Sequence, residues 1–115
     1  VLPPKKNPFP FFIISDLYIM TSLYEGCPNS IVEATMLNLP VISSNCNSGP
    51  SEILLNGRGG TFYKKRNAYS LMKKISLFMN NKKIFKKKLR VAQNNIYRFE
   101  EKRILKQYND LFNTL

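Results

Sequence analysis

The stretch DLYIMTS-LYEGCPN-SIVEATMLNL-PVISSNCNSG, residues 16–49, decides the fold of this chain. Residues 17–21 and 41–44 are short runs rich in apolar and β-branched side chains, without strict polar alternation. Such runs are typical of parallel strands that are covered on both faces. Between them, apolar or small residues recur near helical spacing at Ile31, Ala34, Thr35 and Leu39, and Asn38-Leu39-Pro40 ends the helix. The stretch therefore predicts a strand, a turn, a helix and a second parallel strand.

The turn at residues 25–29 is the candidate site. Open parallel sheets bind ligands beyond the carboxyl ends of their strands, and this turn lies at such an end. It leads into a helix N-terminus, where backbone N–H groups and the helix dipole favour anions. We expect the amides of Cys27, Asn29 and Ser30 to hold phosphate oxygens. Gly26 would let a ligand approach the backbone, whereas Pro28 has no N–H and can only shape the turn.

Two carboxylates bracket the turn, since Glu25 and Glu33 are separated by seven residues. The run YEGCPNSIVEATMLNLPVISSNCNSGPSEIL, residues 24–54, resembles the donor site of retaining, nucleotide-sugar-dependent glycosyltransferases with the two-Rossmann GT-B architecture. The resemblance is to their large family four, the glycosyl transferases group 1. A bare glutamate pair would mean little, but the ordered set of motifs is specific.

The resemblance implies a function for each residue of the turn. Glu25 would be the catalytic carboxylate, contacting hydroxyls of the donor sugar, and Glu33 would bind the ribose of the nucleotide. The remaining donor-binding residues would be Gly26, Cys27, Pro28, Asn29, Ser30 and Ile31. No metal or other cofactor is expected. The partners would be a nucleotide sugar and a glycan or lipid-linked acceptor, and the product would retain the configuration of the donor sugar.

The expected fold is α/β, a partial Rossmann-like parallel sheet of about three strands with flanking helices and a helical C-terminal tail. The third strand would be residues 61–63. Three helices follow from apolar spacing: Leu71, Ile75 and Phe78; Phe85, Leu89, Ala92, Ile96 and Phe99; and Ile104, Tyr108, Leu111 and Leu115. By the resemblance, residues 1–115 would be the C-terminal part of a GT-B donor domain. The acceptor domain and the first strands of the donor domain would lie outside them, and the chain alone would be inactive.

Composition excludes several classes of site. The chain has no histidine, which removes His-based metal sites and His-dependent nucleophilic triads. Cys27 and Cys46 lack metal-ligand spacing, and two such thiols suggest a reducing compartment. No apolar run approaches the roughly 20 residues of a membrane-spanning helix. We therefore expect a cytoplasmic protein, peripheral to the inner face of the membrane at most.

The net charge of +11 is unevenly distributed, because residues 61–115 carry fifteen of the eighteen basic residues. The simplest interpretation is a solvated face formed by Lys82, Lys83, Lys86, Lys87 and Arg90. A second is a nucleic-acid-binding module; it is disfavoured because the face is mainly lysine and the module leaves residues 16–54 unexplained. A third is contact of the basic helices with anionic lipid, which is compatible with an enzyme that acts on lipid-linked acceptors.

Structural alternatives exist for the motif residues too. Ser30-x-x-Glu33 fits a capping box, in which Glu33 only satisfies backbone donors. Cys27 would be a small residue in a tight place, and Gly49-Pro50 would form a turn. The apolar stripes with aromatic residues would belong to the core.

Overall fold

The computed structural model describes residues 3–4, 6–46 and 48–114. Three parallel strands form one sheet in the order β1 (Tyr18–Met20), β2 (Val41–Ser44), β3 (Thr61–Tyr63). Ile42 is the register partner of Ile19 in β1 and of Thr61 in β3. The three-stranded parallel α/β sheet predicted from the sequence is confirmed.

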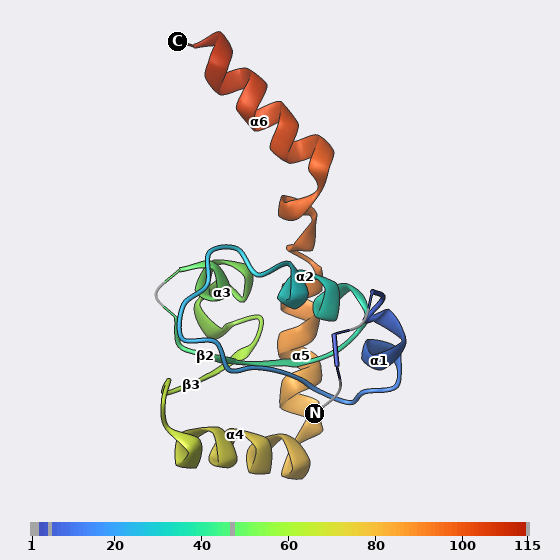
Figure 1. The fold of residues 1–115 in the computed structure, drawn as a ribbon, viewed down its shortest axis with the longest axis vertical. Coiled ribbons are helices and arrows are strands. Elements are labelled where there is room, and N and C mark those ends of the chain that lie inside the picture. Colours follow the sequence, from blue (N-terminus) through green and yellow to red (C-terminus); the bar gives the residue numbers. More distant parts are fainter. Residues whose placement is uncertain (1–2, 5, 47, 115) are drawn as a thin grey trace.

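Helices cover both faces of this sheet (Figure 1). On one face lie α2 (Asn29–Met36) and α3 (Gly49–Ile53), which enclose a core of Met20, Ile31, Ala34, Leu39, Val41, Ile53 and Leu54. On the other face lie α4 (Ala68–Asn80) and α5 (Lys82–Gln93), around Ile42, Tyr63, Phe78 and Phe85. Full burial of one such apolar side chain contributes about 1.5–3 kcal/mol. The strand sequences do not alternate between apolar and polar residues because helices pack on both faces of the sheet.

Asparagines lie at the ends of three helices. One adopts the left-handed backbone conformation after α2, and two cap the starts of α4 and α5 with their side chains. Asn38 has φ 66° directly after α2, as the Asn-Leu-Pro run predicted. Asparagine tolerates this region better than most residues. At the starts of α4 and α5, the side chains of Asn67 and Asn81 accept hydrogen bonds from the N–H groups of Ser70 and Ile84, at 2.7 and 3.4 Å. Each such cap stabilises its helix by about 1 kcal/mol.

Two short helical segments precede strands of the sheet, one before β1 and one before β3. The helix α1 (Phe9–Ile13) precedes β1, and its Phe12 ring packs edge-on against Tyr18 at a centroid distance of 5.6 Å. A 3₁₀ turn, η1 (Leu55–Gly57), connects α3 to β3. These contacts place α1 beside the first core cluster.

The C-terminal segment differs from the prediction in two ways. The second predicted helix ends at Gln93, and Ile96 and Phe99 lie in a separate 3₁₀ turn, η2 (Ile96–Phe99). The last helix, α6 (Glu101–Asn113), projects away from the body (Figure 1), and its described residues are exposed. The prediction that its apolar stripe belongs to the core is therefore wrong for Tyr108, which is 57% exposed. Leu115 lies outside the described residues.

Candidate functional site

The turn that holds Glu25 lies between the carboxyl end of β1 and the start of α2. Glu25 is half-buried and lines a hollow of about 100 Å³. The other residues that line the hollow are Leu23, Tyr24, Cys46, Ser48 and Lys65. These residues follow β1, β2 and β3, so the carboxyl ends of all three strands contribute to one site.

Contacts from the segment after β2 hold the backbone of the turn. The Ser48 hydroxyl donates a hydrogen bond to the Glu25 carbonyl oxygen. Gly49 lies so close to Gly26 that a Cβ at Gly49 would overlap the Gly26 carbonyl oxygen and come within 2.7 Å of Pro28 Cδ. Gly49 is thus required for close packing of two backbones, which is more than the turn-forming role expected from the sequence. The arrangement fixes the direction in which Glu25 leaves the backbone.

A second set of hydrogen bonds anchors the start of the same loop. The Ser22 carbonyl oxygen accepts from the Ser44 hydroxyl and, at 3.1 Å, from the Cys46 thiol. Both donors are buried at the carboxyl end of β2. Polar atoms buried in this way are costly unless paired. Their pairing ties the loop after β1 to the neighbouring strand.

The N-terminus of α2 presents N–H donors that have no protein acceptor in the part of the chain that the structure describes. The structure gives the N–H groups of Cys27, Asn29 and Ser30 no backbone acceptor among the described residues. Pro28 is the N-cap and provides no side-chain cap. Asn29 and Cys27 are exposed, so the prediction that Cys27 fills a tight place is wrong. Exposed amides at the positive end of a helix suit an anion.

The capping-box alternative for Ser30 and Glu33 is contradicted by the geometry. The helix begins at Asn29, so Ser30 lies inside it and cannot be its N-cap. The Ser30 hydroxyl instead accepts a hydrogen bond from the Tyr18 hydroxyl at 2.9 Å. Glu33 is half-buried, and its carboxylate has no hydrogen-bond partner in the part of the chain that the structure describes. Glu33 also lies outside the lining of the hollow beside Glu25.

Ile31 is packed differently from its neighbours in the motif. Its side chain is fully buried in the first core cluster, and its N–H donates to the Pro28 carbonyl oxygen at 3.1 Å. A buried side chain and an occupied N–H leave Ile31 little to offer a ligand. Ile31 therefore belongs to the core that supports the turn, and its place among the donor contacts stays a prediction.

Lys65 was not singled out in the sequence. Its ammonium lies 5.3 Å from the centroid of the Tyr24 ring, and it lines the same hollow as Glu25. The available signal was its position two residues after the third predicted strand, at the carboxyl edge of the sheet. Lys65 is the cation that the fold brings to this hollow.

Two other kinds of feature are absent from the residues that the structure describes. No group of three or more Cys, Asp or Glu side chains in residues 3–4, 6–46 and 48–114 is arranged to hold a metal ion. Within the same residues, no helix combines the length and apolarity needed to cross a membrane. The candidate site consists of the turn, the N-terminus of α2 and the hollow beside them.

Comparisons with known proteins agree on one family. The model for "Glycosyl transferases group 1" matches residues 4–98. An uncharacterized glycosyltransferase of Methanocaldococcus jannaschii is 35% identical over 92% of this chain and 28% of its own length. The N,N'-diacetylbacillosaminyl-diphospho-undecaprenol alpha-1,3-N-acetylgalactosaminyltransferase of Campylobacter jejuni is 29% identical over 84% of this chain and 26% of its own.

Solved structures show the same fold. A glycosyltransferase from Rickettsia africae superposes with a TM-score of 0.82 at 22% identity, over 96% of this chain and 30% of that protein. Anabaena HepE, solved in complex with UDP, has a TM-score of 0.81 at 22% identity, over 91% of this chain and 29% of that protein. The chain thus spans less than a third of the length of each of these four proteins.

Proposed function

The chain belongs to the glycosyl transferases group 1 family, and from this premise we propose that residues 25–33 bind the nucleotide-sugar donor of a retaining glycosyltransferase. The observation that supports the proposal most is the fixed turn. Ser48 and Gly49 hold the backbone at Glu25 and Gly26, and the exposed N–H groups of α2 follow directly. A carboxylate and a set of anion-binding amides are thereby presented together at the carboxyl edge of the sheet.

Each part of the site has a task in such a transfer. The amides of Cys27, Asn29 and Ser30 hold phosphate oxygens of the donor and stabilise the charge that develops as the nucleoside diphosphate leaves. Glu25 accepts hydrogen bonds from hydroxyls of the sugar, and Glu33 accepts them from the ribose. The Lys65 ammonium beside Glu25 adds positive charge to the same edge.

The reaction needs no side-chain base. The bond between the anomeric carbon and the diphosphate oxygen breaks, and the acceptor oxygen bonds to that carbon on the same face. The acceptor proton passes to the departing phosphate oxygen. Negative charge grows on the leaving group as its bond to the anomeric carbon breaks, so the leaving group is more negative in the transition state than in the ground state. Amides fixed in place before the reaction therefore lower the barrier.

We further propose that the partners are a uridine-type donor and a glycan or lipid-linked acceptor. The structure of Anabaena HepE contains UDP, and the name of the Campylobacter relative describes a diphospho-undecaprenol substrate. Residues 1–115 would be the donor-binding part, and the transfer would also need the remainder of the length seen in relatives. A cytoplasmic site at the inner face of the membrane suits a lipid-linked acceptor. The nucleic-acid alternative is not favoured, because the family match includes the whole of residues 16–54.

The test is sugar transfer by a full-length protein that contains these residues. It would be supplied with uridine, guanosine, adenosine and thymidine diphosphate sugars, and the released nucleotide would be measured. NMR of the product gives the anomeric configuration, and we expect retention. We expect the 115-residue chain alone to show no transfer. Absence of transfer from every donor by the folded full-length protein, or an inverted product, would overturn the proposal.

A further inference from the structure

A larger cavity lies at the opposite edge of the sheet from Glu25. It has a volume of about 410 Å³ and is lined by residues that precede β1 and β2, including Asp16 and Asn38, and by one side of α5. Its apolar lining comes from Leu39, Pro40, Phe78 and Leu89. The cavity therefore adjoins the amino ends of the strands, whereas the proposed donor site lies at their carboxyl ends.

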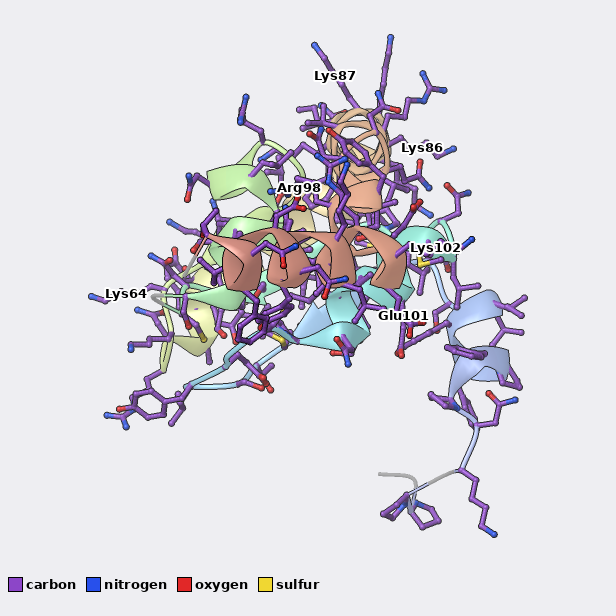
Figure 2. All side chains as sticks on the ribbon, turned by 90° about the horizontal axis from the view of Figure 1, so that it is seen from above. Lys64, Lys86, Lys87, Arg98, Glu101 and Lys102 are labelled. Atoms are coloured by element: carbon purple, nitrogen blue, oxygen red, sulfur yellow. The ribbon has the colours of Figure 1, made fainter. Side chains whose placement is uncertain are left out.

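Three cations of α5 line this cavity, namely Lys82, Lys86 and Arg90. They recur every four residues, so they lie on one face of the helix. Lys83 and Lys87 are also exposed on the same helix but do not line the cavity. Figure 2 shows Lys86 and Lys87 leaving the helix in different directions. The basic residues of α5 thus form two sets, and one of them is associated with a cavity.

The cavity has more positive than negative charge. Asp16 is the carboxylate among the residues that line it, and it pairs with Lys82 at 3.9 Å. The side chains of Lys86 and Arg90 have no hydrogen-bond or ion-pair partner in the part of the chain that the structure describes. Gln93 donates to Asn38 Oδ1 at 3.3 Å, which leaves the Asn38 amide N–H groups as donors at the same cavity.

We propose that this cavity is a second ligand site, which binds a phosphate-bearing molecule through Lys82, Lys86 and Arg90. Arginine offers a planar fork of N–H groups that matches phosphate oxygens, and each lysine adds a charged donor. The apolar lining accommodates the group that carries the phosphate. The phosphate belongs either to a small soluble compound or to a lipid headgroup, because both present the same oxygens.

The chain contains a matched control for the test. The variant Lys82→Gln/Lys86→Gln removes two cations of the cavity, and Lys83→Gln/Lys87→Gln removes two cations of the other set. Both variants lose the same charge from the same helix. Binding of inorganic pyrophosphate to the 115-residue chain would be measured by calorimetry at low salt, with circular dichroism of each variant as the folding check.

We expect pyrophosphate to bind the wild type, and Lys82→Gln/Lys86→Gln to weaken the affinity roughly tenfold, because charge-assisted hydrogen bonds are lost. Lys83→Gln/Lys87→Gln should change it less than about twofold, since those charges are distant and screened. Equal weakening by both variants would show diffuse attraction to a basic surface, and an unchanged affinity in both would show that pyrophosphate binds at the turn after β1 instead. Either result would overturn the site. Absence of wild-type binding to both pyrophosphate and the vesicles described next would overturn it as well.

Vesicles separate the two sources of phosphate. Co-sedimentation would use phosphatidylglycerol vesicles, with phosphatidylcholine vesicles as the neutral control. Binding that falls in the first variant and persists in the second identifies the ligand as a lipid headgroup. Pyrophosphate binding without vesicle binding identifies a soluble phosphate compound.

Asp16 provides a variant that should strengthen binding. Asp16→Asn removes the carboxylate that competes for Lys82, so pyrophosphate affinity should rise about twofold to fivefold. A gain of affinity cannot result from damage to the fold. A loss of affinity in a folded Asp16→Asn variant would contradict the proposed role of the Lys82 ammonium.

Discussion

The carbonyl oxygen of Gly26 occupies the space that a side chain on Gly49 would need. Gly26 lies in the turn after β1, and Gly49 begins α3, so two segments far apart in the sequence meet backbone to backbone. The Ser48 hydroxyl bonds to the Glu25 carbonyl oxygen beside this contact. The position of the Glu25 carboxylate therefore depends on a residue that carries no functional group.

Gly49→Ala should destabilise the protein and displace the turn. The added methyl group would meet backbone atoms of Gly26, which cannot rotate away as a flexible side chain can. Overpacking of this kind costs about 1–3 kcal/mol. Urea unfolding would measure the loss. An unchanged unfolding free energy would show that the turn moves freely and does not hold Glu25.

Gly26→Ala is the matched control for this contact. A Cβ added at Gly26 would have no heavy atom within 4 Å, and the backbone φ of Gly26 is not positive. We expect the unfolding free energy to change by less than about 0.5 kcal/mol. In a full-length protein, donor affinity should nevertheless fall, because the methyl group points into the space left for the ligand. Unaltered donor binding would place the donor elsewhere.

The two glutamates should affect different kinetic constants in a full-length protein. Glu25→Gln should lower kcat more than it raises KM, because its contact with the sugar strengthens as charge develops in the transition state. Glu33→Ala should mainly raise KM for the donor, because ribose contacts are similar in the ground and transition states. Steady-state kinetics with varied donor would distinguish them. Wild-type constants in both variants would remove these residues from the site.

The sequence predicted the central unit well because its signals are local. The unalternating runs at β1 and β2 result from burial of both faces, and Asn38 combines tolerance of positive φ with a following proline. The carboxyl-edge position of Glu25 followed from its place after the first predicted parallel strand. These features depend on neighbours in the sequence and on the general topology of parallel sheets.

Features that depend on distant contacts were missed. The Tyr18 hydroxyl, twelve residues earlier in the sequence, donates a hydrogen bond to the Ser30 hydroxyl. In a capping box the Ser30 hydroxyl would instead accept from a backbone N–H group. Lys65 reaches the hollow beside Glu25 only because β3 ends there. The stripe on α6 has the spacing of a core helix, yet no described element covers it. The spacing of apolar residues identifies the apolar face of a helix but not the element that packs against it.

Lys88 should stabilise the loop before β3. Its ammonium donates to the carbonyl oxygens of Gly57 and Gly60 at 2.8 and 3.0 Å. Lys88→Met keeps the length of the side chain and removes both hydrogen bonds, which should cost about 1–3 kcal/mol in urea unfolding. Lys87→Met, an exposed neighbour, should change the unfolding free energy by less than about 0.5 kcal/mol. Equal effects of the two variants would show that these hydrogen bonds contribute nothing.

The difference in unfolding free energy between wild type and Lys88→Met should increase with pH. Burial, and then the charge of Lys74, lower the pKa of Lys88 below its ordinary 10.5. Between the lowered pKa and 10.5 the unfolded chain binds more protons at this residue, so its contribution to the unfolding free energy rises with pH. The difference between wild type and Lys88→Met should therefore grow as pH approaches 10.5. Tyr63, whose pKa is raised by burial and then by Cys46, titrates in both proteins and cancels from the difference.

The 115-residue chain should self-associate through α6. Leu105, Leu111 and Phe112 are between 53% and 68% exposed on this projecting helix (Figure 1), and β1 adds an edge that pairs only with β2 among the described residues. Exposed apolar stripes and open strand edges both favour contact between chains. Light scattering should show oligomers whose mass rises with concentration.

Leu105→Glu/Phe112→Glu should reduce that mass without altering the unfolding of the core, because the described residues of α6 are exposed. A concentration-independent monomer with a sharp unfolding transition would contradict the prediction, and oligomers unchanged in the variant would assign the contact to β1 instead.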